Sequence, residues 1–215
     1  MIYNIAMSLI DIECSYLLSR EWKLFHFKTT EKCDETVRGE KYFSELNVYQ
    51  RCANILLTKG VLHLHSSFVL HQGKALLFTG PSGIGKTTQA ELWRDYQGSM
   101  IVNGDACLMR KIEGGWYAFG TPVHGTSSYC ENKKAPISAI IILKQWEENL
   151  LVKADPFSAL SSSLSEFYRP RMRKETEEKF WNAIDSLFQE IPFYHLNCRP
   201  DKEATEIVKR EIFGV

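Results

Sequence analysis

Apolar and polar residues alternate near the start of the chain, and further along the apolar ones recur with a longer period. The alternation within residues 1–28 predicts two or three partly buried strands, and the polar stretch 28–39 predicts a loop. Between residues 40 and 59 the apolar positions recur at steps of three and four, and Gly60 follows them. This pattern predicts an amphipathic helix that ends at a glycine.

The remainder of the chain alternates between short apolar runs and helical periods. Residues 61–71 predict a strand, and Gln72-Gly73 turns the chain into an apolar run at 75–79. A hairpin here favours a mixed sheet, because parallel neighbours need a longer crossover. Further strands are predicted at 100–102, 107–112, 116–119, 137–143 and 191–196, and helices at 175–189 and after the capping residue Asp201.

With no repeat or linker, the pattern predicts one α/β domain over residues 1–215. Its core is expected to be a mixed β-sheet flanked by helices. Residues 1–60, the N-terminal strands and helix, are expected to pack on the same core.

Composition and charge narrow the class of protein. The 215 residues are 44% hydrophobic, which is enough for a sizeable core. Lys plus Arg and Asp plus Glu both number 26, and the resulting net charge of zero argues against a nucleic-acid or anionic-membrane partner. The six cysteines are scattered without metal-ligand spacing, and neither a signal peptide nor a membrane span is predicted. We therefore expect a cytoplasmic protein with reduced thiols and a local binding site.

The segment Gly80-Pro81-Ser82-Gly83-Ile84-Gly85-Lys86-Thr87-Thr88 fits the phosphate-binding P-loop pattern G-x-x-x-x-G-K-[ST] without a gap. Its glycines let successive backbone N–H groups point at one anion, and the helix that follows adds the positive end of its dipole. Lys86 is expected to reach the β- and γ-phosphates of ATP, and Thr87 to ligate Mg²⁺. The predicted nucleotide-binding residues are Gly80, Ser82, Gly83, Ile84, Gly85, Lys86, Thr87 and Thr88.

A P-loop enzyme that transfers phosphate needs a carboxylate near the metal ion, and Asp105 is the candidate. It follows the strand at 100–102, where the end of a strand would meet the phosphate loop, although an ordinary turn residue would give the same pattern. His63 and His65 are two residues apart in a predicted strand, so they share a face. They fit packed histidines as well as a site, and no third ligand suggests a metal centre.

Two other segments each allow two interpretations, one functional and one purely structural. The small, polar loop at 120–128 suits either a substrate-facing loop or a plain surface loop. Arg169, Arg171 and Arg173 could face a phosphate or a phosphoacceptor, or could simply be solvated.

From His65 to Gly80, a histidine-led strand, a short turn, an apolar strand and the glycine loop resemble the C-terminal domain of HPr kinase/phosphorylase. ATP-dependent phosphoenolpyruvate carboxykinase is a relative of that family. The resemblance covers residues 63–143. It implies a sheet of that family's type, and it implies that His65, rather than His63, takes the place of the active-site histidine. The family's pair of aspartates is Gly104-Asp105 here, which leaves the division between base and metal ligand open.

Residues 119–122 and 135–145 look more like the small HPr-kinase-like proteins encoded beside ribosomal-peptide maturation genes. Some members of that group phosphorylate a serine or the tail of a lasso-type precursor peptide. No copy of the HPr-binding loop is found, so HPr is not the first substrate expected.

These features predict an ATP- and Mg²⁺-dependent kinase. Its catalytic residues are expected to be Asp105, His65 and Lys86, and its metal ligands Thr87 and Asp105. The expected acceptor is a peptide or protein hydroxyl, with a small-molecule hydroxyl as the alternative. Because Gly104 replaces the first aspartate of the resembled family, a nucleotide-binding module without catalytic activity is a further alternative. The chain lacks the L-S-G-G-Q signature of transporter ATPases and the N-K-x-D motif of GTPases. Purine preference and oligomeric state, a homo-oligomer included, stay open.

Overall fold

The computed structural model describes residues 56–112, 114–121, 124–169 and 174–215, apart from the side chain of residue 175, and the backbone of four strands nearer the N-terminus. These strands form an antiparallel sheet in the order β1-β2-β3-β4. Their bounds are β1 (Ile2–Leu9), β2 (Ile12–Leu18), β3 (Lys23–Thr29) and β4 (Asp34–Gly39).

The strands predicted within residues 1–28 are confirmed, and the loop predicted at 28–39 is wrong, because β4 pairs with β3 there. The strand β4 is mostly polar and therefore lacks the alternation of apolar residues that predicts a strand. The helix predicted at 40–59 lies outside the described residues except for its end, where residues 56–58 are helical. Gly60 follows with φ of +74°. The packing of residues 1–60 on the common core stays a prediction.

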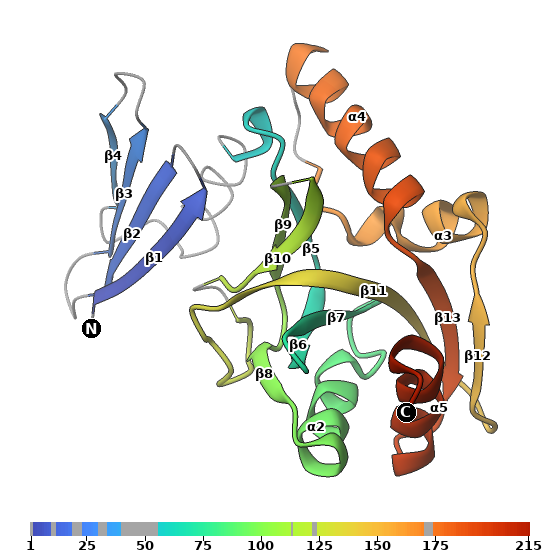
Figure 1. Cartoon of the computed structure of the whole chain (residues 1–215). Helices are drawn as coiled ribbons and strands as arrows, with labels where there is room; N and C mark the ends of the chain where they lie inside the picture. Colours follow the sequence, from blue (N-terminus) through green and yellow to red (C-terminus); the bar gives the residue numbers. More distant parts are fainter. Residues whose placement is uncertain are drawn as a thin grey trace.

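The main sheet has nine strands in the order β5-β9-β10-β11-β7-β6-β8, with β13 beside β11 and β12 beside β13. The long strand β11 pairs with β10 through its first residues and with β13 through its last ones (Figure 1). The strands β7, β11 and β13 are parallel, and the other pairs are antiparallel. The predicted mixed sheet is therefore confirmed. The bounds are β5 (Leu62–Leu64), β6 (Ser66–His71), β7 (Lys74–Thr79), β8 (Met100–Asn103), β9 (Cys107–Ile112), β10 (Gly115–Phe119), β11 (Lys134–Gln145), β12 (Leu150–Lys153) and β13 (Phe193–Cys198).

The strand predicted at 61–71 is two strands, and the break falls at His65. The first, β5, pairs with β9, whereas the second, β6, pairs with β7 and β8. The predicted turn between β6 and β7 is confirmed, since Gln72 and Gly73 both have positive φ, at +48° and +77°. His65 therefore lies where the chain passes from one part of the sheet to another.

Helices cover both faces of this sheet (Figure 1). They are α2 (Lys86–Gln97), α3 (Pro156–Ser163), the 3₁₀ turn η1 (Leu164–Glu166), α4 (Lys174–Glu190) and α5 (Lys202–Phe213). The predicted helices at 175–189 and after Asp201 are confirmed as α4 and α5. The elements β12, α3 and η1 were not predicted, because their few apolar positions show no clear period.

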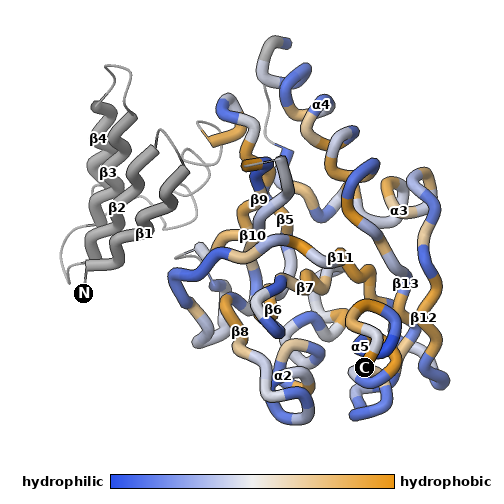
Figure 2. Tube along the Cα trace, viewed as in Figure 1, coloured by the Kyte–Doolittle hydropathy of each residue, from blue (hydrophilic) through white to orange (hydrophobic). Residues whose placement is uncertain are grey.

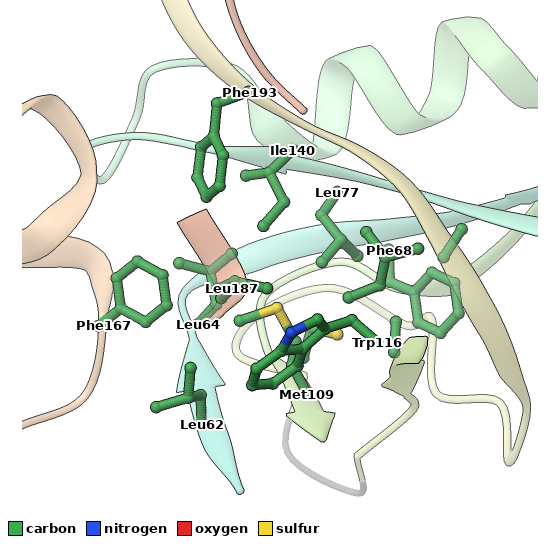
Figure 3. Packing of buried hydrophobic residues seen from close by; sticks show 14 of the residues in the cluster. Leu62, Leu64, Phe68, Leu77, Met109, Trp116, Ile140, Phe167, Leu187 and Phe193 are labelled. Carbon is green, nitrogen blue, oxygen red and sulfur yellow. The ribbon is translucent and has the colours of Figure 1, made fainter. Parts of the chain in front are cut away.

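The strand β7 has a core on each side, which explains its continuous apolar sequence. Leu77 belongs to a cluster with Phe68 and Ile140 that α3 and α4 complete (Figure 3). Leu76 and Phe78 belong to a second cluster, which α2 and α5 complete. Figure 2 shows hydrophobic residues along much of the neighbouring strand β11 as well. Burial on both sides holds the end of β7, and the loop that follows it, in a fixed position.

None of the helices in the described part of the chain is both long enough and apolar enough to cross a lipid bilayer.

Candidate active site

The glycine-rich motif that begins at Gly80 forms the turn between β7 and α2, so the predicted order of strand, loop and helix is confirmed. Gly80, Gly83 and Gly85 have φ of +139°, +79° and +108°. Side chains strain the backbone in this region, so glycine is the residue that suits these positions. The loop therefore has the curled backbone that can direct several N–H groups toward one point.

The helix α2 begins without a capping side chain. Its N-cap residue is Gly85, no side chain bonds to its first N–H groups, and its first turn carries no acid. Such an end attracts an anion through its N–H groups and its dipole.

Lys86 lies over the same loop. Its Nζ donates hydrogen bonds to the carbonyl oxygens of Gly80, at 2.8 Å, and Pro81, at 3.2 Å. Burial lowers the pKa of Lys86, and the carboxylates of Glu166 and Asp105 act against that shift. The ammonium group is thus placed beside the loop and within the field of two carboxylates.

Asp105 is held beside the phosphate loop by an Asx turn after β8. The side-chain Oδ1 of Asn103 accepts hydrogen bonds from the N–H groups of Asp105, at 2.8 Å, and Ala106, at 2.9 Å. The hydroxyl of Thr87, in the first turn of α2, donates to the carbonyl oxygen of Gly104 at 3.1 Å. The two residues predicted to hold a metal ion therefore come from segments in direct contact.

His65 lies between two carboxylates. Its Nε2 is 3.3 Å from Oδ1 of Asp105, and its Nδ1 is 2.9 Å from Oε2 of Glu166. The hydrogen bond with Asp105 raises the pKa of His65 most, while burial and Lys86 lower it and Glu166 raises it. The same bond with His65 lowers the pKa of Asp105. The ion pair favours the charged forms of both groups.

Glu166 is the main site residue that sequence reasoning missed. It ends η1 and lies 101 positions from His65, and no motif marks it. Ser67 and Gln145 were also missed. The buried hydroxyl of Ser67 donates to the carbonyl oxygen of Lys86 at 2.9 Å, and Nε2 of Gln145 donates to the carbonyl oxygen of Ile84 at 3.3 Å. Both bonds fix the loop from neighbouring strands.

The loop at 120–128 contacts the acidic side of the site through its described residues. A side chain at Gly104 would begin 2.4 Å from Oγ of Ser127 and 3.6 Å from Oγ1 of Thr87. A side chain at Gly125 would begin 2.8 Å from Cγ of Asp105. Oγ of Ser127 donates to the carbonyl oxygen of His124 at 2.8 Å. Ser127 thus occupies the space that a first aspartate at position 104 would need.

An open pocket of about 730 Å³ adjoins His65. His63 lines it and contacts the ring of Tyr168, with 5.6 Å between ring centroids. Arg169 also lines the pocket, and its guanidinium lies 5.7 Å from the ring centroid of Trp181. Arg171 and Arg173 lie outside the described residues. The two histidines therefore meet at this pocket, as their predicted shared face suggested, although β5 itself ends at Leu64.

The residues present fit a nucleoside triphosphate with a divalent cation. The loop offers a curled backbone, an uncapped helix end and a buried ammonium group. Thr87 and Asp105 offer a hydroxyl and a carboxylate, the oxygen ligands that Mg²⁺ prefers. Among the residues that the structure describes, no three His, Cys, Asp or Glu side chains form a metal cluster. A cation here would take its protein oxygen ligands from Thr87 and Asp105.

Comparison with known proteins adds little to this geometry. No protein-family model matches the chain, and no curated protein matches it. Among solved structures, the chain is similar to the HPr(Ser) kinase/phosphatase from Coxiella burnetii, with 13% sequence identity and a TM-score of 0.44. The match covers 69% of this chain and 94% of that one.

Proposed function

We propose that this protein is an ATP- and Mg²⁺-dependent kinase that transfers the γ-phosphoryl group to a hydroxyl of a peptide or protein. The observation that carries the proposal is the convergence of Lys86, Thr87, Asp105 and His65 around one glycine loop. A glycine turn between a strand and a helix needs neither a carboxylate nor a histidine at its mouth.

Each group has a distinct role. The loop backbone and Lys86 hold the phosphates, and Thr87 with Asp105 would hold the cation. Bound Mg²⁺ would neutralise charge on the β- and γ-phosphates. The acceptor oxygen forms a bond to the γ-phosphorus, the bond to the β–γ bridging oxygen breaks, and ADP leaves. The hydroxyl proton passes to the Asp105–His65 pair, which lies beside the loop.

The pocket beside His65 favours a peptide or protein as the acceptor. Small-molecule sites enclose most of their ligand, whereas this pocket is open and lies at the surface. Its rim carries the aromatic ring of Tyr168 and the exposed guanidinium of Arg169. A serine, or the tail of a ribosomally made lasso-type precursor, is the first acceptor to test, following the sequence resemblance.

The test is phosphoryl transfer from Mg·ATP to degenerate Ser-, Thr- and Tyr-containing peptides, followed by mass spectrometry, with hydroxy acids and free amino acids in parallel. Lys86→Ala and Asp105→Asn should each lower transfer about 100- to 1,000-fold, because each removes charge stabilisation or proton acceptance at the reacting group. Lys153→Ala, at an exposed lysine of β12, is the matched control and should leave transfer unchanged.

If both site variants transfer phosphate as fast as the unaltered chain, the assignment is wrong. Modification of hydroxy acids or amino acids alone would identify a small-molecule kinase. Binding of Mg·ATP without transfer to any acceptor would instead identify a nucleotide-binding module that acts without chemistry.

A further inference from the structure

The ring of His65 has a carboxylate at each nitrogen, and the two contacts differ. Nδ1 lies 2.9 Å from Glu166, within normal hydrogen-bond distance, whereas Nε2 lies 3.3 Å from Asp105. Asp105 contacts the phosphate loop through its neighbour Gly104, and Glu166 approaches His65 from η1. Glu166 therefore holds the side of the ring that faces away from Asp105.

The fold fixes Glu166 through its backbone as well. The N–H of His65 donates to the carbonyl oxygen of Glu166 at 2.9 Å, and the N–H of Tyr168 donates to that of His63 at 2.9 Å. Between these bonds Leu64 and Phe167 form an antiparallel bridge, and both side chains are buried in the core (Figure 3). The segment 166–168 is thus stitched to β5, and Glu166 cannot shift without moving His65.

The carboxylate of Glu166 is equally constrained. Its side chain is 10% exposed, compared with 39% for Asp105. Its Oε2 contacts His65, and its Oε1 accepts a hydrogen bond from the hydroxyl of Ser165 at 3.2 Å. A nearly buried carboxylate that is hydrogen-bonded to a ring nitrogen can hold the ring in one orientation. An exposed carboxylate is less able to do so, because it can bond to water instead.

We propose that Glu166 is a positioning residue for the reaction: it orients the His65 ring and, in the neutral ring, keeps the proton on Nδ1. This inference rests on the proposed kinase function. A carboxylate only accepts hydrogen bonds, and a neutral ring has one N–H, so it can donate to Glu166 or to Asp105 but not to both. The contact with Glu166 is the shorter one, at 2.9 Å against 3.3 Å, which favours a proton on Nδ1 and a lone pair on Nε2. Nε2 and Oδ1 of Asp105, 3.3 Å apart, then form a pair of acceptors for the proton that leaves the acceptor hydroxyl.

Two substitutions separate this role from a structural one. Glu166→Ala removes the acceptor at Nδ1, whereas Glu166→Gln keeps a side-chain oxygen that can still accept the hydrogen bond. Glu206→Gln, which breaks an exposed ion pair with Lys202 on α5, is the matched control for loss of one carboxylate.

Nitrogen-15 NMR of histidine-labelled full-length protein, at a pH that leaves the ring neutral, reads which nitrogen carries the proton. We expect Nδ1 in the unaltered chain and in Glu166→Gln, and a shift to Nε2, facing Asp105, in Glu166→Ala. The kcat for transfer from Mg·ATP to the best acceptor peptide of the pool should fall at least about tenfold in Glu166→Ala. The KM for Mg·ATP should stay the same, and Glu166→Gln should recover most of the rate.

A proton on Nδ1 in Glu166→Ala, or an unchanged kcat, would overturn the inference while leaving the kinase assignment intact. Equal rates for Glu166→Ala and Glu166→Gln would also overturn it. An unaltered chain that transfers phosphate to no acceptor would instead overturn the proposed function itself, and the positioning role with it.

Discussion

The helices α2 and α5 pack together over the same face of the sheet, yet their first turns are built differently. At α5, the Asp201 carboxylate accepts a hydrogen bond from the N–H of Ala204 at 3.1 Å, and Glu203 adds an acid to the first turn. At α2, Gly85 takes the corresponding position, with neither a side-chain cap nor an acid. The start of α5 is capped by a side chain of the chain itself, whereas the start of α2 has no side-chain cap.

The charged groups near the two helix starts differ in the same way. Near α5, the Asp201 carboxylate accepts a hydrogen bond from Asn149 and forms an ion pair with Arg199. Beside α2, the side chains of Lys86, His65, Asp105 and Glu166 lie within reach of each other. Such a cluster is costly to bury, so its presence beside an uncapped helix is more easily explained by function than by stability.

The largest effect expected from this contrast is a loss of folding stability at low pH, which we attribute to His63, a residue beside the candidate site. Burial, together with the charge of His65, lowers the pKa of His63 from 6.5 to about 4, against the pull of Asp105. Between these pH values the unfolded chain binds the extra proton, so stability is full above pH 6.5 and falls toward pH 4. The loss is about 3 kcal/mol.

Urea unfolding of the unaltered chain and of His63→Asn between pH 7.5 and pH 4 tests this. The variant should lose less stability over the window, because asparagine takes up no proton. Partial burial raises the pKa of Asp201, but its hydrogen bonds from Ala204 and Asn149 and the charge of Arg199 outweigh that, and the net pKa is lowered. The contribution of Asp201 to folding stability should therefore be lost completely only at a pH below the ordinary pKa of an aspartate. Parallel curves for the two chains would contradict the assignment to His63.

The next effect is the loss of the α5 cap. Asp201→Ala should lower the free energy of unfolding by about 1 kcal/mol. The N–H of Ala204 and the side-chain amide of Asn149 would each lose the carboxylate that accepts their hydrogen bond. Mg·ATP binding should be unchanged, which isothermal titration calorimetry would measure. A change in nucleotide affinity would show that the two helix ends are not independent.

The smallest effect comes from giving α2 the acid that it lacks. Thr88→Asp places a carboxylate in the exposed first turn of α2 and should stabilise the nucleotide-free protein by about 0.5 kcal/mol. The same charge should weaken Mg·ATP binding by repelling the phosphates. Thr88→Asn, of the same shape and without charge, is the control. Tighter binding by Thr88→Asp would show that phosphate does not occupy this end of the helix.

The part of the site that could be predicted from sequence is the part that lies within one short segment. The glycine loop is a local motif in which spacing alone carries the chemistry, and Asp105 was found because it directly follows a strand. Glu166 could not be predicted from sequence, because it lies 101 positions after His65. The two residues meet only because the folded chain brings η1 next to β5. The break at His65 was missed for a related reason: the residues on both sides are buried strand residues, and only their partners differ.

The contact between Gly104 and Ser127 imposes an order on any change at this position. Enlarging residue 104 first would drive a side chain into a hydroxyl group that lies 2.4 Å from where its Cβ would be. Reducing residue 127 to glycine first would open the space without a clash. An acid at position 104 should therefore be tolerated better when residue 127 is glycine than when it is serine.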